Sequence, residues 1–315
     1  MKYLEIKIDN KNIKVSKIAL GSARSIQSLS REECFRIFDI YYDLGGNCID
    51  TARAYNDGKS EALIGEYFSQ RHNREKFIIS TKGCHMAKDG KGRLSKADME
   101  SDLNESLKAL QTDFIDIYWI HKDDENHPVE DVIDDMNALI KEGRIGVVGV
   151  SNWRIDRIAK ANEYAKQSGQ IGFQLSQIQW SLASTLEEYF KKYTAVVMDS
   201  QSYDWYINND FTIFSFGSQA QGFFAKAAAQ GVEVLNDEMK LFYANKDNLR
   251  RLGLVKKLAE QQNMPISAPV LAYLINNKLS CVPIIGASSE KMLRESMSAL
   301  DFEMTSAEAD ALFYV

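Results

Sequence analysis

Three strand-like runs in the first half of the chain each end in a side chain that can take part in acid–base chemistry. Asp50 closes the run N-C-I-D, Lys82 closes F-I-I-S-T-K, and His121 closes I-D-I-Y-W-I-H. Tyr55 follows Asp50 by five residues, in a stretch that reads as a loop. Tyrosine is a poor acid near neutral pH because its unperturbed pKa is about 10, but a nearby cation lowers that pKa. We therefore expect Tyr55 to donate a proton with Lys82 as its electrostatic partner.

This set of residues fits the reduction of a carbonyl group. Asp50 would orient Lys82, and His121 would hold the carbonyl oxygen in line with the tyrosine hydroxyl. None of these groups supplies electrons, so a hydride donor is required. Taken singly, each has a structural explanation as well. Asp50 could cap a turn, Lys82 could be a solvated strand end, and Tyr55 could pack a loop.

Alternating strand-like and helical patterns are expected to position these residues. The eight strand-like runs are 18–21, 47–52, 77–82, 114–121, 147–152, 174–180, 212–216 and 281–286. Strand–helix alternation favours a parallel sheet with right-handed crossovers, and eight repeats predict a (β/α)8 TIM barrel, which keeps its chemistry at the carboxyl ends of its strands. Before the barrel, alternating apolar and polar residues at 4–8 and 12–16 predict a β-hairpin.

Helical spacing and cap residues predict the intervening helices. Capping boxes are expected at Ser30 with Glu33 and at Thr305 with Glu308, and single caps at Ser95, at Ser267 and at either Ser288 or Ser289. The predicted helical segments begin after Ser30 and Ser95 and span 60–68, 129–142, 155–167, 246–262, 268–277 and 290–300, with a short last helix after Thr305. Residues 217–280 are expected to hold an extra loop and two of these helices. Residues 181–211 are interpreted as an elaborated connection with a short strand at 196–198 and a helix at 200–209. No linker-like tract interrupts residues 1–315, so we expect a single barrel domain.

Composition narrows the class of protein. Hydrophobic residues make up 45% and charged residues 26% of the 315 residues, which is typical of a soluble globular protein. The net charge of −6 argues against nucleic-acid or anionic-membrane partners. We expect no membrane span, because no apolar run approaches about 18 residues, and no signal peptide, because the first residues are charged. The four cysteines form no CxxC pair, which suits reduced thiols in the cytoplasm. Cys84 and His85 lack further ligands, so no metal site is expected.

Four motifs in order resemble the aldo-keto reductases over essentially the whole chain. They are D-T-A-x-x-Y, T-K at the next strand end, D-x-Y-x-x-H, and G-V-S-N, and P-I-I-G-A-S-S follows near residue 286. The resemblance implies a (β/α)8 barrel with a short hairpin closing its bottom. It also implies that Asp50, Tyr55, Lys82 and His121 form the catalytic tetrad. H-K-D-D at 121–124 resembles the H-R-x-D pattern of the longer bacterial-type and potassium-channel-β-like members.

The same resemblance implies a nicotinamide dinucleotide extended across the barrel top without a Rossmann motif. Ser151, Asn152 and Gln177 would hold the carboxamide, Phe216 would stack on the nicotinamide, and the loop from Gly217 to Gly222 would fold over the pyrophosphate. The residues implied at the adenine end are Gly286, Ser288, Met292, Glu295 and Ser296. Met292 stands where the family often has a basic residue that grips the 2′-phosphate of NADP, although Ser288, Lys291 and Arg294 are near. We expect NADP(H) as the cofactor, with NAD(H) as the alternative. Ser151 and Asn152 could instead be an ordinary strand-to-helix cap, and Phe216 a core residue.

The sequence indicates the class of substrate less clearly than it indicates the type of reaction. Arg53, His85, Lys122 and Trp153 lie just past strand ends and are the candidate substrate-binding residues. A polar rim of this kind favours hydroxylated or anionic substrates, and an ordinary solvated rim explains it equally well. The predicted function is NAD(P)H-dependent reduction of an aldehyde or ketone, with sugars and small aldehydes among the candidates. The alternatives are a cofactor-sensing subunit with little turnover and a barrel enzyme with a metal at Cys84 or His85.

Overall fold

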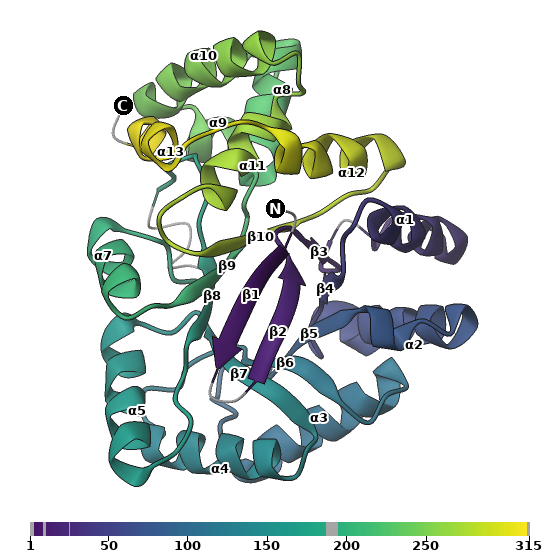
Figure 1. Cartoon of the computed structure of the whole chain (residues 1–315), viewed down its shortest axis with the longest axis vertical. Coiled ribbons are helices and arrows are strands. Elements are labelled where there is room, and N and C mark those ends of the chain that lie inside the picture. Colours follow the sequence, from purple (N-terminus) through teal and green to yellow (C-terminus); the bar gives the residue numbers. More distant parts are fainter. Residues whose placement is uncertain (1–2, 9–10, 25, 187–194, 314–315) are drawn as a thin grey trace.

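Eight parallel strands close into a barrel in the order β10-β3-β4-β5-β6-β7-β8-β9. The computed structural model describes residues 3–8, 11–24, 26–186 and 195–313. The barrel strands are β3 (Ala19–Gly21), β4 (Cys48–Asp50), β5 (Ile78–Gly83), β6 (Ile115–Ile120), β7 (Ile145–Ser151), β8 (Leu175–Gln179), β9 (Thr212–Phe216) and β10 (Cys281–Ile285). The antiparallel strands β1 (Tyr3–Ile8) and β2 (Lys11–Ser16) form a separate hairpin that crosses the barrel in Figure 1. The predicted (β/α)8 TIM barrel with an N-terminal hairpin is confirmed.

The barrel interior is filled by side chains from alternate strand positions, because successive residues of a strand point to opposite faces. Ile6 and Val15 of the hairpin pack into the same buried cluster as Cys48, the first residue of β4. The barrel residues of this cluster are Ala19, Cys48, Ile117, Trp119, Val147, Leu175, Phe214 and Val282. The hairpin therefore closes the amino-terminal end of the barrel, and the carboxyl ends of the strands are left for chemistry.

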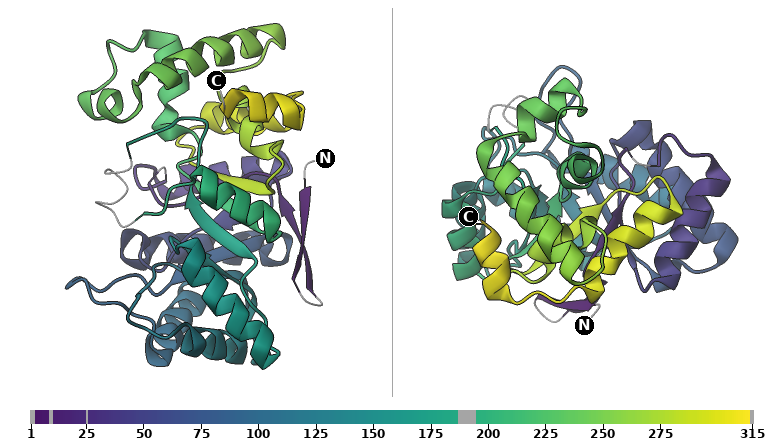
Figure 2. Two further views of the ribbon diagram at one scale, coloured as in Figure 1. Left: turned by 90° about the vertical axis from the view of Figure 1, so that its left-hand side faces the viewer. Right: turned by 90° about the horizontal axis from the view of Figure 1, so that it is seen from above.

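The helices lie around the barrel, except that those of residues 223–261 form an outer group on one side of the molecule, where they pack largely on other helices (Figure 2). They are α1 (Arg31–Asp43), α2 (Lys59–Arg71), α3 (Lys96–Leu110), α4 (Val129–Lys141), α5 (Ile155–Ser168), α7 (Ser200–Asn208), α8 (Phe223–Gln230), α9 (Asp237–Tyr243), α10 (Lys246–Gln261), α11 (Ser267–Ile275), α12 (Glu290–Met297) and α13 (Ser306–Phe313). Short 3-10 turns lie at Tyr55–Gly58, Arg74–Lys76, Ala220–Gly222 and Ser298–Asp301.

Most of the predicted helix starts are confirmed by their hydrogen bonds. Ser30 and Glu33 bond reciprocally in a capping box, and the Ser95 hydroxyl accepts from the amide of Asp98. The predicted Ser267 cap is wrong, because Ser267 is already the first residue of α11 and no side chain caps that helix. Its hydroxyl instead donates to the carbonyl of Glu295 at 3.0 Å, which ties α11 to α12.

The stretch between β9 and β10 holds four described helices, α8 to α11, where the sequence predicts only two. The two missed helices are short, with eight residues in α8 and seven in α9. Neither is long enough to repeat an apolar spacing, and helix α9 depends on the Asn236 side chain, which accepts from the amide of Met239 at 2.8 Å. In the connection after β8, Val197 forms an isolated bridge with Gln179, and α7 confirms the predicted helix. Residues 187–194 of that connection lie outside the described residues.

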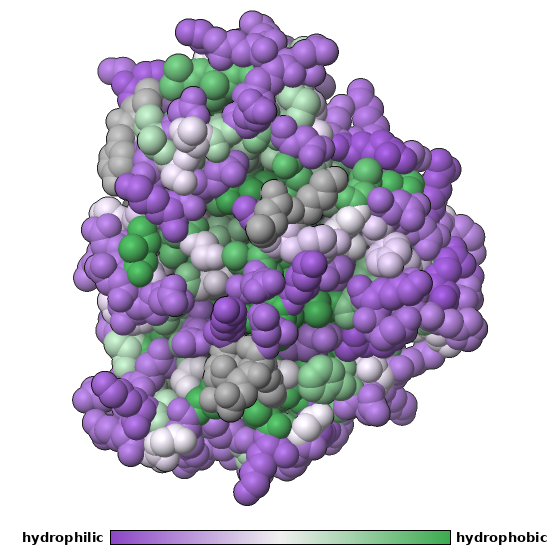
Figure 3. Space-filling view, viewed as in Figure 1, coloured by the Kyte–Doolittle hydropathy of each residue, from purple (hydrophilic) through white to green (hydrophobic). Residues whose placement is uncertain are grey.

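Polar side chains cover most of the face that carries the hairpin, with smaller apolar areas between them (Figure 3). None of the helices within the described ranges is both long enough and apolar enough to cross a bilayer.

Candidate active site

Strands β4, β5 and β6 are neighbours in the barrel, and this places three of the predicted catalytic residues side by side. Asp50 ends β4, Lys82 is the next-to-last residue of β5, and His121 directly follows β6. Their positions in the sequence are more than 30 residues apart, but parallel pairing aligns the carboxyl ends of the strands at one rim.

Lys82 and Asp50 form a buried ion pair. The Lys82 ammonium donates to Asp50 Oδ1 at 2.6 Å and to the carbonyl of Thr51 at 2.6 Å. Burial alone would lower the pKa of Lys82, but the negative charge of Asp50 and the adjacent Tyr55 outweigh it, so the Lys82 pKa is raised from its usual value. Lys82 therefore stays charged inside the barrel.

The second oxygen of Asp50 is held by two further donors. The hydroxyl of Ser80 donates to Asp50 Oδ2 at 2.8 Å, and the amide of Gln177 donates to the same oxygen at 2.9 Å. The indole of Trp119 in turn donates to the Ser80 hydroxyl at 2.8 Å. Three donors on one carboxylate compensate for the loss of water around it. Ser80 and Trp119 were not singled out from the sequence. Their signal is the two-residue period that puts Ser80 on the same strand face as Lys82.

Tyr55 begins the turn after β4, and its ring lies over the Lys82 ammonium, which is 4.7 Å from the ring centroid. The sequence predicted that the Asp50–Lys82 pair lowers the pKa of Tyr55, but the net direction is the opposite. Burial raises the pKa of Tyr55 and Asp50 adds to the rise, while the charge of Lys82 opposes it. The Tyr55 hydroxyl thus holds its proton at neutral pH, which is the state that a proton donor needs.

His121 packs its ring against both Tyr55 and His85. The ring centroids are 5.8 Å from Tyr55 and 4.7 Å from His85, both edge to face. Burial lowers the pKa of His121 well below its usual value, and the charge of Lys82 lowers it further. Its Nδ1 has no hydrogen-bond partner among the residues that the structure describes. A neutral imidazole with an unsatisfied nitrogen beside Tyr55 is suited to orient a polar group of a ligand.

The three predicted carboxamide residues are joined in one chain of hydrogen bonds that leads to Asp50. Asn152 Nδ2 donates to the Ser151 hydroxyl at 3.0 Å, and that hydroxyl donates to the carbonyl of Gln177 at 3.1 Å. The Gln177 amide bonds Asp50, as described above. Ser151 ends β7, Asn152 follows it, and Gln177 is the third residue of β8, so the three offer amide and hydroxyl groups toward the barrel mouth.

Phe216 ends β9 and is followed by the predicted pyrophosphate loop. Gly217 has a φ of +64° and Gly222 a φ of +81°, which is the left-handed region that favours glycine. The amide of Gln219 in this loop donates to the Ser296 hydroxyl of α12 at 3.1 Å. The loop is thereby tied to the helix that carries the predicted adenine-binding residues.

The adenine end is exposed except at Ser296, which is buried, and its charges are paired. Gly286 and Ser288 are exposed, and Met292 is 47% exposed. Lys291 lies 3.8 Å from Glu295, and Arg294 lies 2.9 Å from Glu290. The Ser288 hydroxyl contacts the Met292 sulfur at 3.4 Å. The cations that the sequence placed near the 2′-phosphate position are therefore shared with carboxylates of their own helix.

The four candidate substrate residues have different surroundings. Arg53 donates to Glu105 of α3 at 2.5 Å. Trp153 is fully buried and packs edge to face on Phe173 at 5.8 Å, so this placement does not support its predicted contact with substrate. His85 is half-buried beside His121. Lys122 is also half-buried, and burial lowers its pKa to about 8.

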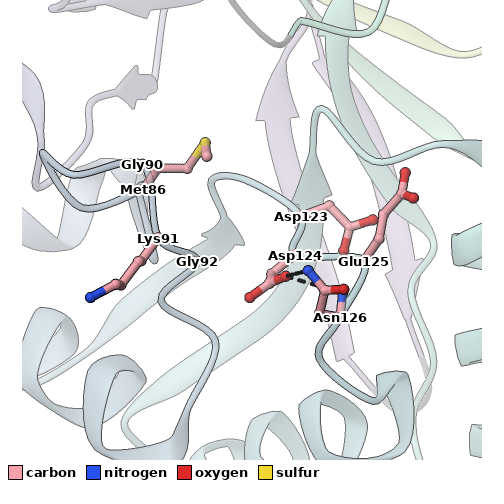
Figure 4. Close-up of a pocket in the computed structure, with 8 residues that line it drawn as sticks. All are labelled: Met86, Gly90, Lys91, Gly92, Asp123, Asp124, Glu125 and Asn126. Carbon is pink, nitrogen blue, oxygen red and sulfur yellow. Dashed lines mark hydrogen bonds between the residues drawn. The ribbon is translucent and has the colours of Figure 1, made fainter.

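A cleft of about 530 Å³ opens between the loops that follow β5 and β6 (Figure 4). Two of the loop residues that line it, Met86 and Asp123, follow His85 and His121 closely in the sequence. Its lining residues are Met86, Gly90, Lys91, Gly92, Asp123, Asp124, Glu125 and Asn126. Asp123 is held by Arg157 of α5 through two bonds of 3.0 Å, and Asp124 accepts from the amide of Asn126 at 3.1 Å.

A parallel (β/α)8 barrel with a buried lysine–aspartate pair, a tyrosine and a histidine at one rim has the architecture of a barrel enzyme. The sequence profile of the Aldo/keto reductase family matches residues 17–313, and the chain belongs to this family. Members of this family generally use nicotinamide cofactors and act on small carbonyl compounds.

Curated relatives match almost the full chain at low identity. An aryl-alcohol dehydrogenase of Pestalotiopsis microspora is 25% identical over 96% of this chain and 79% of its own length. A probable aryl-alcohol dehydrogenase of Saccharomyces cerevisiae is 26% identical over 90% of this chain and 88% of its own length. A norsolorinic acid reductase B of Dothistroma septosporum is 26% identical over 96% of this chain and 78% of its own length.

Proposed function

We propose that the protein reduces an aldehyde or ketone to an alcohol with a hydride from NADPH, and that Tyr55 donates the proton. The observation that carries this proposal is the placement of Tyr55 between the buried Lys82–Asp50 pair and the neutral His121. Relatives named as aryl-alcohol dehydrogenases favour an aromatic aldehyde as the first substrate to test.

The donor set at the barrel mouth fits a nicotinamide dinucleotide. Amide and hydroxyl groups of Ser151, Asn152 and Gln177 suit a neutral carboxamide, which offers both donors and an acceptor. The aromatic Phe216 suits a planar ring, and the glycines of the next loop let its backbone approach a phosphate. When bound, the dinucleotide supplies the hydride.

The chain's own residues then divide the work. His121 hydrogen-bonds the carbonyl oxygen and directs it toward Tyr55. Tyr55 gives its proton to that oxygen as negative charge develops there, and Lys82 stabilises the resulting tyrosinate. Asp50 keeps Lys82 in place.

Replacing Tyr55 by phenylalanine tests the assignment, because it removes one hydroxyl and leaves the ring. We expect the turnover of 4-nitrobenzaldehyde to fall by about 10² to 10⁴, the usual contribution of a general acid. The matched control is Tyr164→Phe on α5, where the hydroxyl bonds Asp134 on the outer surface. Full activity of Tyr55→Phe would remove the proposal.

The choice of NADPH is tested by comparing Michaelis constants for NADPH and NADH. The paired charges at Lys291 and Arg294 keep NADH as the alternative, and a lower Michaelis constant for NADH would select it. Tight binding of either nucleotide without turnover of any aldehyde or ketone would favour a cofactor-sensing subunit instead.

We further propose that residues 1–315 form one barrel domain and that the protein works in the cytoplasm. The four cysteines are free and buried, which agrees with a reducing compartment. Cooperative unfolding in a single calorimetric transition would support the first statement, and cell fractionation tests the second.

A further inference from the structure

Gln179 is the last residue of β8, and its side chain points into the open mouth of the barrel. Its strand partner in the register is Phe216, the last residue of β9. Leu175 and Gln177 share its strand face, since side chains alternate along a strand. Leu175 lies in the interior cluster and Gln177 reaches Asp50. Gln179 therefore lies one layer above Gln177, on the side of the barrel where the ligand is expected.

The side-chain amide of Gln179 is buried but has nothing to donate to. The residue is 3% exposed, and its Nε2 has no hydrogen-bond partner among the described residues. Both backbone groups of Gln179 are hydrogen-bonded. The backbone N–H donates to the carbonyl of Val196 at 3.0 Å, and the backbone carbonyl accepts from the N–H of Met198 at 2.9 Å. A buried unsatisfied amide destabilises a fold, so it calls for an acceptor.

The position of the Gln179 amide is given by its distance from Gly217. A Cβ at Gly217 would come within 3.5 Å of the Gln179 Cγ and 3.8 Å of its Nε2. The amide thus runs alongside the first residue of the loop that follows Phe216. Phe216 and this loop are the proposed contacts of the nicotinamide ring and the pyrophosphate, so Gln179 faces the part of the dinucleotide between them.

We propose that Gln179 is a cofactor-binding residue that donates a hydrogen bond to an oxygen of the nicotinamide half of the bound dinucleotide. This inference rests on the proposed function, because it needs the dinucleotide to occupy the barrel mouth. Gln177, two residues earlier, gives one N–H of its amide to Asp50, whereas the amide nitrogen of Gln179 has no acceptor among the described residues and is free to serve the cofactor.

The test compares Gln179→Leu and Gln179→Glu in the full chain. The leucine removes the donor, and the glutamate keeps the shape but replaces the donor by an acceptor. Dissociation constants are measured by fluorescence titration with NADPH and with 2′,5′-ADP, which carries only the adenine half. The matched controls are Gln174→Leu and Gln174→Glu, at an exposed position just before β8 at the closed end of the barrel.

We expect NADPH to bind both Gln179 variants about 10 to 100 times more weakly, the effect of one lost hydrogen bond to a charged or buried group. Binding of 2′,5′-ADP should stay at the wild-type value, and the Gln174 variants should bind both nucleotides normally. Without nucleotide, Gln179→Leu should unfold at the wild-type temperature or above it, because no hydrogen bond among the described residues is lost.

Three results would overturn the inference. Unchanged NADPH binding in both variants, with wild-type turnover, would reject the role of Gln179 in cofactor binding and leave the proposed function unaffected. An equal loss of 2′,5′-ADP binding, or a lower unfolding temperature of Gln179→Leu without nucleotide, would show a structural role. If the wild-type protein binds neither NADPH nor NADH, the proposed function fails and the inference fails with it.

Discussion

The ammonium of Lys82 lies 2.6 Å from Asp50 Oδ1 inside the barrel, and neither side chain is more than 3% exposed. This pair is the centre of a polar network that reaches Ser80, Trp119 and Gln177, and Tyr55 lies directly over it. The loss of either partner would leave the other charge buried without compensation, so we expect the stability of the protein to depend on both.

Replacing Asp50 by asparagine should destabilise the protein by about 3 to 5 kcal/mol, because Lys82 would remain as a buried charge without its partner. Urea unfolding of the variant and the wild type measures this difference. The control is Glu100→Gln, which breaks an exposed pair with Lys96 and should change the free energy of unfolding by less than about 1 kcal/mol. A loss at Asp50 no larger than the loss at Glu100 would contradict this account of the pair.

Ser80→Ala should lower both stability and activity. The Ser80 hydroxyl donates to Asp50 and accepts from the Trp119 indole, so its removal leaves a buried indole N–H without a partner. We expect a loss of about 1 to 3 kcal/mol in the free energy of unfolding. Ser168→Ala, at the exposed end of α5, serves as the control. Wild-type stability of Ser80→Ala would show that the network does not need the hydroxyl.

The buried neutral state of His121 should make the protein less stable in mild acid. Its folded-state pKa lies well below 6.5, so below pH 6.5 the unfolded chain binds a proton that the folded chain does not. Stability from this group is complete above pH 6.5 and falls as the pH drops toward the folded-state pKa. The free energy of unfolding should therefore be lower at pH 5.5 than at pH 7.5.

His121→Gln should remove that part of the acid sensitivity. The measurement is the free energy of unfolding at pH 7.5 and pH 5.5, with His72→Asn at the exposed end of α2 as the control. An identical pH dependence in His121→Gln and the wild type would refute the assigned cause.

Lys122 should favour substrates that carry a negative charge. It follows His121 directly, and its pKa of about 8 keeps it mostly protonated at neutral pH. In Lys122→Gln the Michaelis constant for 4-carboxybenzaldehyde should rise about tenfold or more, and that for 4-nitrobenzaldehyde should change little. In the wild type, the preference for the carboxylate should fade as the pH rises through 8. Lys141→Gln at the exposed end of α4 is the control, and equal effects on both aldehydes would rule out a charge contact.

The class of fold and the candidate chemistry could both be predicted from the order and types of the residues. Eight apolar runs alternating with helical patterns specify a parallel barrel, because each run must be buried on both faces and each helix on one. The strand ends at Asp50, Lys82 and His121 follow from that alternation. The short helices α8 and α9 could not be predicted, because seven or eight residues make only about two helical turns and the apolar spacing is not repeated often enough to be recognised.

How these groups act on one another could not be predicted, because it depends on the packing of the folded barrel. The direction of the Tyr55 pKa depends on how deeply the hydroxyl is buried, and the pattern of residue types carries no measure of that depth. The enclosure of Trp153 and the orphan amide of Gln179 depend equally on which side chains from distant parts of the chain close around them. The two-residue period of a strand predicts which face a side chain occupies. Its burial and its hydrogen-bond partners depend on contacts that form only in the folded barrel.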